Sequence, residues 1–245
     1  MQPWDEIGDR IFRRRYPELD QNIGAIVTDD GLVVIDSRSH PHHARILRGD
    51  LTRLSPLPVR WLINTHEHWD HTFGNQLFPE AVIVEHTNCR RGLLSAGPEL
   101  VAELKQADWF PAEERHHFDE VEIVPPTLVF DDETRLWAGG RELRLSYHGR
   151  GHTDGDIVIV IDDVTFAGDL VEEGGPPNFG DSYPREWVDT LRMVADLVTG
   201  PVVPGHGDVV DRAHVVWQAY DIGAAIAGEP SSITGPHLDT LRSRL

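Results

Sequence analysis

The chain has 245 residues, of which 40% are hydrophobic, so it can bury the core of one large domain or two small ones. Its 41 acidic residues outnumber 22 basic ones and give a formal net charge of -19, which argues against a nucleic-acid partner because phosphate binding needs clustered lysine and arginine. Cys89 is the only cysteine, which excludes an internal disulfide and a structural metal site built from thiolates.

The N-terminal sequence MQPWDEIGDR lacks the basic segment and apolar run of a secretory signal. No apolar stretch approaches the ~20 residues that a membrane-spanning helix requires. We therefore expect a cytoplasmic protein without a membrane partner, and the sequence leaves its oligomeric state open.

Apolar runs and turn signals predict strands and helices in the first half of the chain. Residues 22–37 contain two apolar runs separated by Asp30-Gly31, which indicates a hairpin. Apolar residues recur with helical spacing over 41–54 and predict an amphipathic helix. After it we expect a buried strand in VRWLINTH, a short helix in DHTFGNQLF and another strand in AVIVEH.

The second half begins with an acidic, irregular insertion over about 88–120, with helical propensity in PELVAELKQADWF. Short strands follow in TLVFDD, TRLWAG and ELRLSYHG, and DIVIVIDDVTFAGDLV repeats the hairpin pattern. We expect one helix over 187–198, ended by Gly200, and a last helix over 213–224.

This order of elements predicts an α/β protein. Two similar halves, each with apolar strands and amphipathic helices, favour two packed sheets with helices outside. No linker rich in serine, glycine and proline divides the halves. We therefore expect a single domain over 1–245, with 208–245 forming a C-terminal helix and tail.

Histidine and aspartate gather at four strand-to-loop junctions. The segment NTHEHWDH carries four candidate ligands within six positions, and GHTDGD, FAGDL and PGHG each contribute one more. Glycines beside these residues let the backbone turn tightly and bring the side chains close. Neutral imidazole and carboxylate gathered this densely indicate a metal site. The seven residues are His66, His68, Asp70, His71, His152, Asp169 and His206.

The four segments, in this order, resemble the metallo-β-lactamase superfamily over about residues 10–210. The resemblance implies a four-layer αββα sandwich of two mixed sheets and the activity of a metal-dependent hydrolase. It implies two zinc ions, although manganese, iron or cobalt can use the same nitrogen and oxygen ligands. A hydroxide bridging the metals would be the nucleophile. By this resemblance the first metal would be bound by His66, His68 and His152. The second would be bound by Asp70, His71 and His206, with Asp169 bridging the two. The residues implied to be catalytic are His66, His68, Asp70, His71 and Asp169.

Other polar residues are expected to have structural roles. The pairs His42-His43 and His116-His117 are expected to face solvent, and His86, His148 and His214 are expected to be structural histidines and not ligands. Trp69, between two ligands, is expected to form a packing wall beside the site, and Asp154 and Asp156 are expected to brace the turn around His152.

Domains and residues of other branches of the superfamily that this sequence lacks narrow the expected substrate class. Only 39 residues follow His206, too few for the helical domain of the glutathione-thioester hydrolases, and the chain is too short and acidic for the nucleic-acid-processing branch. Glu172 stands where many β-lactamases carry a basic residue that holds the drug's carboxylate. We expect hydrolysis of an ester, thioester, lactone or related acyl bond of a small molecule. A β-lactam hydrolase, a mononuclear iron dioxygenase of the persulfide type and a non-catalytic metal-binding module are the alternatives.

Overall fold

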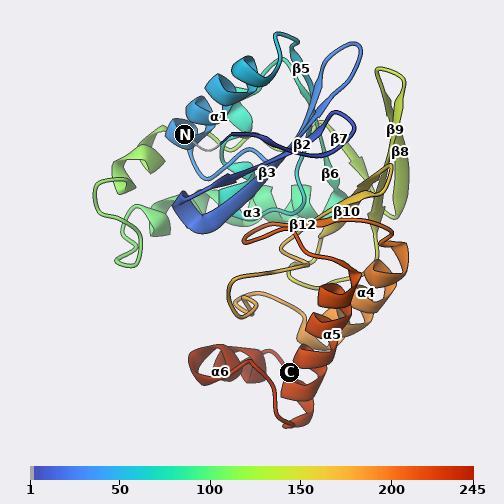
Figure 1. Cartoon of the computed structure of the whole chain (residues 1–245). Helices are drawn as coiled ribbons and strands as arrows, with labels where there is room; N and C mark the ends of the chain where they lie inside the picture. The colour runs from blue at the N-terminus through green and yellow to red at the C-terminus, as the bar shows by residue number, and fades with distance from the viewer. Residues whose placement is uncertain (1–2) are drawn as a thin grey trace.

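Two β-sheets packed against each other form the centre of the protein in a computed structural model that describes residues 3–245 (Figure 1). The first sheet has seven strands in chain order, antiparallel from β1 to β4 and parallel from β4 to β7. Its strands are β1 (Asp5–Gly8), β2 (Ile11–Tyr16), β3 (Gln21–Val27), β4 (Leu32–Ile35), β5 (Val59–Ile63), β6 (Val82–His86) and β7 (Leu128–Phe130).

The second sheet has five strands in the order β12-β11-β10-β9-β8. Only the β11–β12 pair is parallel, so both sheets are mixed. Its strands are β8 (Glu133–Ala138), β9 (Arg141–Tyr147), β10 (Ile157–Ile161), β11 (Val164–Gly168) and β12 (Val202–Pro204).

Apolar side chains between the sheets form the central core. Ile26 and Val33 from the first sheet meet Ile159 and Phe166 from the second in one buried cluster. Strand β4 is buried at every position and β10 at every position but Val160, and both are apolar throughout because they are covered on both faces. The two sheets therefore fix each other's position, and with them the loops at their ends.

Helices cover the outer faces of the two sheets (Figure 1). On the first sheet, α1 (Pro41–Leu54) and the sheet share a buried cluster, and α3 (Thr87–Leu104) contacts β6 and β7. On the second sheet, α4 (Pro184–Leu197) and α5 (Arg212–Ala227) pack on residues of β10, β11 and β12. The predicted α/β sandwich of two mixed sheets with helices outside is confirmed. The remaining helices are α2 (Trp69–Thr72) and α6 (Gly235–Ser243), with 3-10 turns η1 (Glu18–Asp20), η2 (Asn75–Leu77) and η3 (Arg115–Glu120).

Several predicted elements differ from the observed ones. The region expected to be irregular begins with the 18-residue helix α3, which starts at Thr87, where the His86 side chain accepts a hydrogen bond from the backbone N–H of Asn88. Pro98 lies inside this helix and interrupts its sequence pattern. Helix α4 ends at Leu197, and Gly200 has another role, because a Cβ there would lie 2.6 Å from the Asp163 carbonyl oxygen.

The two ends of the chain hold more structure than the sequence suggested. Strands β1 and β2 were not predicted, since IFRRRY carries three arginines, two of which are buried by pairing with Asp5, Asn22 and Asp50. The C-terminal part holds a second helix, α6, beyond the one expected. Within residues 3–245, no helix combines the length and apolar character needed to cross a bilayer.

Candidate metal centre

The seven predicted ligands come together at one edge of the two sheets. Strand β5 ends at Ile63, and the chain then turns through His66 and His68 into the short helix α2, which holds Asp70 and His71. The other three lie in loops of the second sheet: His152 lies between β9 and β10, Asp169 follows β11 and His206 follows β12. Both sheets therefore contribute to one cluster.

The first group consists of three histidines and an aspartate. The ring nitrogens His68 Nδ1 and His152 Nε2 are 2.9 Å apart, and Asp169 Oδ2 lies 3.4 Å from His152 Nε2 and 3.8 Å from His66 Nε2. One potential ligand atom from each of these residues lies within 4.8 Å of the others. Three imidazoles and a carboxylate at this spacing match the ligand types of zinc.

The second group lies directly beside the first. His71 Nε2 is 3.3 Å from Asp70 Oδ2, and His206 Nε2 is 3.2 Å from the same oxygen. Asp169 belongs to both groups, because its Oδ1 is 3.3 Å from His71 Nε2 while its Oδ2 faces the first group. The structure thus brings all seven predicted residues together, with Asp169 between two ligand sets.

Glycine allows this close approach. A Cβ added at Gly205 would lie 1.8 Å from Asp169 Oδ1, so no other residue fits there without moving the carboxylate. Gly168, which precedes Asp169, has φ +51, and a Cβ there would lie 2.5 Å from Thr65 Oγ1. The sequence prediction that glycines beside the ligands let the backbone approach is confirmed at these two positions.

Buried polar atoms without a partner test whether metal ions fit the site. His66 Nε2, His71 Nε2 and Asp169 Oδ1 are buried and lack any hydrogen-bond partner. All three point into the two ligand groups, and buried polar groups normally have partners. Their orphaned atoms and the mixture of imidazole and carboxylate donors fit two divalent metal ions.

In three of the histidines, the ring nitrogen that faces away from the cluster has a hydrogen-bond partner of its own. His71 Nδ1 is 2.8 Å from Asp36 Oδ2, His68 Nε2 is 3.0 Å from Asp181 Oδ2, and His206 Nδ1 is 2.7 Å from the Leu19 carbonyl oxygen. Such contacts keep the proton on the outer nitrogen and leave the inner one free for a metal. Asp36 and Asp181 were not predicted as part of the site, although Asp36 follows an apolar strand just as Asp169 does.

Two further contacts complete this outer layer. His66 Nδ1 is 3.0 Å from Thr65 Oγ1, and His152 Nδ1 is 3.4 Å from Glu172 Oε1. Asp156 braces the turn around His152, as predicted, by accepting hydrogen bonds from the backbone and hydroxyl of Thr153.

The electrostatics of the cluster favour positive charge at its centre. Burial alone would lower the pKa of His152, but Glu172 and Asp169 outweigh it and raise the pKa to about 10. Burial alone would raise the pKa of Asp169, yet His206, His71 and His66 hold it well below its usual range. The carboxylates thus stay ionised in a buried place, where they stabilise a bound cation.

A cavity of about 410 Å³ opens beside the ligands. Trp69, Leu100 and Trp109 form its apolar wall, and the predicted packing of Trp69 is seen in its contacts with Trp109 and Phe110. Among the described residues that line this cavity none is lysine or arginine. The acidic residues lining it are Asp70, Asp169, Glu172 and Asp181.

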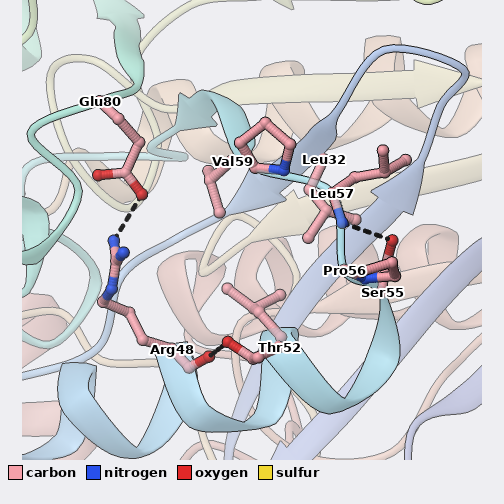
Figure 2. Close-up of a pocket in the computed structure, with 10 residues that line it drawn as sticks. Leu32, Arg48, Thr52, Ser55, Pro56, Leu57, Val59 and Glu80 are labelled. Atoms are coloured by element: carbon pink, nitrogen blue, oxygen red, sulfur yellow. Dashed lines mark hydrogen bonds and ion pairs between the residues drawn. The ribbon is translucent and has the colours of Figure 1, made fainter.

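A smaller cavity of about 240 Å³ lies away from this edge (Figure 2). Its lining includes Leu32 and Val59, which begin β4 and β5, whereas the ligands follow the other end of β5. Figure 2 shows Arg48 paired with Glu80 at one side of this cavity. Their charged groups are 2.7 Å apart. None of the seven candidate ligands is among the described residues that line this cavity, so it is separate from the site.

The remaining histidines divide into structural and unexpected ones. His86, His148 and His214 contact, in turn, the Asp131 carbonyl, the Ser146 hydroxyl and the Glu172 carbonyl, which agrees with the predicted structural roles. The prediction that His42-His43 faces solvent is wrong for His43, which is 3% exposed, because it lies on the same face of α1 as Leu47 and Leu51.

Comparison with known sequences extends these observations. Residues 16–206 match the sequence profile of the family described as the Metallo-beta-lactamase superfamily. The chain is 27% identical over 192 residues to "Metallo-beta-lactamase type 2" of Bacillus cereus, covering 76% of this chain and 66% of that protein. It is 29% identical over 196 residues to "2,4-dinitroanisole O-demethylase subunit alpha" of Nocardioides sp., covering 74% of this chain and 51% of that protein. The chain thus spans less than two thirds of the length of these relatives.

Solved structures share the fold. A metallo-beta-lactamase from Pontibacter korlensis superposes with a TM-score of 0.69 at 18% identity, over 89% of this chain and 98% of that one. The sec-alkylsulfatase Pisa1 from Pseudomonas sp. gives a TM-score of 0.72 at 15% identity, over 97% of this chain and 46% of that one. At these identities the likeness shows the arrangement of the sheets and helices.

Proposed function

The chain belongs to the metallo-beta-lactamase superfamily. We propose that it is a metal-dependent hydrolase that uses two zinc ions to cleave an ester, thioester or lactone of a small, uncharged molecule. The observation that carries this proposal is the convergence of both ligand groups on Asp169. Its Oδ2 lies 3.4 Å from His152 Nε2 and 3.5 Å from His206 Nε2, and its Oδ1 lies 3.3 Å from His71 Nε2. His66, His68 and His152 would hold one ion, and Asp70, His71 and His206 would hold the second. When bound, such ions lower the pKa of water to about 7 and polarise a carbonyl.

The two complete groups favour a two-metal hydrolase over a mononuclear iron dioxygenase. A single-metal enzyme would need only one of them, yet Asp70, His71 and His206 are buried or half-buried and directed at one another. The orphaned atom His71 Nε2 belongs to the second group, which supports a second ion there.

The chain's own residues would orient the substrate. Asn178 lines the cavity, and its Oδ1 accepts a hydrogen bond from the Gly180 backbone, which directs the side-chain N–H groups away from the loop. Trp69, Leu100 and Trp109 offer an apolar surface to an acyl or aryl group. We infer that the substrate presents an apolar group to this wall and its carbonyl to the ligand groups.

The charge balance favours an uncharged substrate. The four carboxylates that line the cavity would be balanced by two divalent ions, so no positive charge would remain to attract an anionic substrate. Glu172, in the place where a basic residue would hold a carboxylate, instead pairs with His152 and accepts a hydrogen bond from the Asn178 backbone. β-Lactam drugs carry such a carboxylate, and we expect weak turnover of them.

The test is a panel of matched substrates with the zinc-loaded protein. Aryl esters, thioesters and lactones would each be offered in an uncharged form and as the analogue bearing a free carboxylate, together with a cephalosporin, a carbapenem and an anisole. We expect faster hydrolysis of the uncharged form in each pair. A kcat/KM in the enzyme range of roughly 10⁴–10⁸ M⁻¹s⁻¹ on a β-lactam would instead make the second candidate, suggested by the Bacillus relatives, the function.

A further inference from the structure

A second gathering of metal-binding side chains lies outside the site described above. His40, His43 and Glu114 each offer a ligand atom, and these atoms lie within 4.8 Å of one another. Glu114 Oε2 is 3.3 Å from His43 Nε2 and 3.6 Å from His40 Nε2. The histidines begin α1, while Glu114 directly precedes η3, so the group joins two segments far apart in the sequence.

One atom of this group is buried without a partner. His40 is 0% exposed, and its Nε2 makes no hydrogen bond. Glu114 Oε2 lies 3.6 Å from this nitrogen, a distance beyond hydrogen bonding. A buried nitrogen directed at a carboxylate but too far to bond it leaves room for an ion between them.

The other ring nitrogens can carry the protons that metal binding requires. His43 Nδ1 is 2.6 Å from Ser39 Oγ. When Nδ1 carries the ring proton, it can donate a hydrogen bond to this hydroxyl oxygen, and Nε2 is then free to bind a metal. His40 Nδ1 accepts a long hydrogen bond of 3.4 Å from the His43 backbone N–H. An ion on His40 Nε2 would place the ring proton on Nδ1 and replace this weak contact.

Both rings are neutral at physiological pH. Burial lowers the pKa of His40 to about 3 and that of His43 to about 2, and the buried guanidinium of Arg38 adds to the effect in both. A neutral imidazole binds a metal without first losing a proton. The negative charge that an ion needs is supplied by Glu114, whose side chain is 29% exposed.

The group also has an entry path and space for further ligands. His43 and Glu114 line a cavity of about 330 Å³ together with Pro17, Leu19 and Phe110, which is wide enough for water. His117 lies nearby, with its ring centre 5.1 Å from that of His40 and its Nδ1 buried without a partner. Water or His117 could therefore complete a tetrahedral arrangement.

We propose that His40, His43 and Glu114 form a third metal site, which binds a divalent ion of the zinc type and fastens the segment around η3 to the start of α1. Two imidazoles and one carboxylate are zinc-type ligands. The segment it fastens carries Phe110 and Phe118, and both rings pack against Trp69 on the wall of the substrate cavity. The ion thus holds this wall in place without touching the substrate.

The test is the number of zinc equivalents bound after equilibrium dialysis, measured by elemental analysis. We expect three equivalents for the wild-type chain and one fewer for Glu114→Gln and for His40→Asn. Asparagine at position 40 keeps a side chain that caps α1 while removing the imidazole. His116→Asn, which changes an exposed histidine of η3, is the matched control and should bind as many as wild type. Hydrogen exchange of residues 108–120 should slow on zinc addition in the wild type but not in Glu114→Gln.

The result also separates this proposal from the two-metal centre. Equal zinc content in wild type, Glu114→Gln and His40→Asn would overturn the third site, whatever the total. If the proposal of a two-metal centre is wrong, substitution of Asp169 should instead leave the zinc content unchanged. If His40→Asn does not fold, Glu114→Gln alone tests the proposal, because glutamine has the same shape as glutamate.

Discussion

Substitution of Asp36 by asparagine tests how the ligand geometry is maintained. Asp36 Oδ2 lies 2.8 Å from His71 Nδ1, while Oδ1 accepts a hydrogen bond from the Thr65 backbone at 2.8 Å. In Asp36→Asn the amide oxygen can keep the bond from Thr65, which places the NH₂ group against His71 Nδ1. That nitrogen must then act as acceptor, so the proton moves to Nε2, where the second metal would bind.

The expected loss concerns the second metal. Removal of such supporting contacts costs about 10–100-fold in metal affinity, equivalent to roughly 1.4–2.7 kcal/mol. Zinc titration against a chelating indicator should show one weakened equivalent, while the equivalent on His66, His68 and His152 keeps its affinity. Asp189→Asn, which changes an exposed carboxylate paired with Arg192, is the control. Affinities equal to wild type at every site would refute the idea that Asp36 sets the protonation of His71.

Three further outcomes follow from the structure. Gly205→Ala should abolish binding of at least one metal, because the new Cβ would lie 1.8 Å from Asp169 Oδ1, and elemental analysis with circular dichroism separates this from unfolding. Trp109→Ala should raise KM more than it lowers kcat, since Trp109 contributes apolar surface to the cavity and no ligand; steady-state kinetics showing only a loss of kcat would contradict this. Zinc-free protein should lose stability as the pH falls below about 6.5 towards 3. Burial lowers the pKa values of His40 and His43 to about 3 and about 2, so the unfolded chain binds more protons in that range. Each histidine contributes about 1.4 kcal/mol per pH unit to the slope of the unfolding free energy against pH. Urea unfolding at a series of pH values should show a shallower slope in His43→Asn than in wild type, and equal slopes would contradict this prediction.

The ligand set could be predicted because its signal is local in the sequence. His66, His68, Asp70 and His71 fall within six positions, Asp169 directly follows an apolar strand, His206 sits between two glycines and His152 follows Gly151. Strands such as β4 and β10 could be predicted because a strand buried on both faces is apolar throughout. These features need no knowledge of the packing.

The supporting residues depend on contacts between distant parts of the chain. Asp181 reaches His68 across 113 positions, and no local pattern links them. Two of the missed residues did carry a signal: Asp36 ends an apolar strand, and His43 shares a helix face with Leu47. The arginines of β2 hid that strand, because their burial depends on partners elsewhere in the fold, such as Asp50.

The most direct test of the two-metal account measures metal content and hydrolysis rate in two proteins, Glu114→Gln and the double variant that also carries Asp169→Ala. Glu114→Gln removes the proposed third site from both, so the zinc count reports the two-metal centre alone. The account predicts two zinc equivalents with Asp169 present. It predicts one or fewer in Asp169→Ala, with a rate on the best uncharged substrate reduced by orders of magnitude and an unchanged circular dichroism spectrum. A folded Asp169→Ala protein that holds two ions and keeps its rate, or a parent protein that holds a single iron and consumes oxygen with a persulfide, would contradict it.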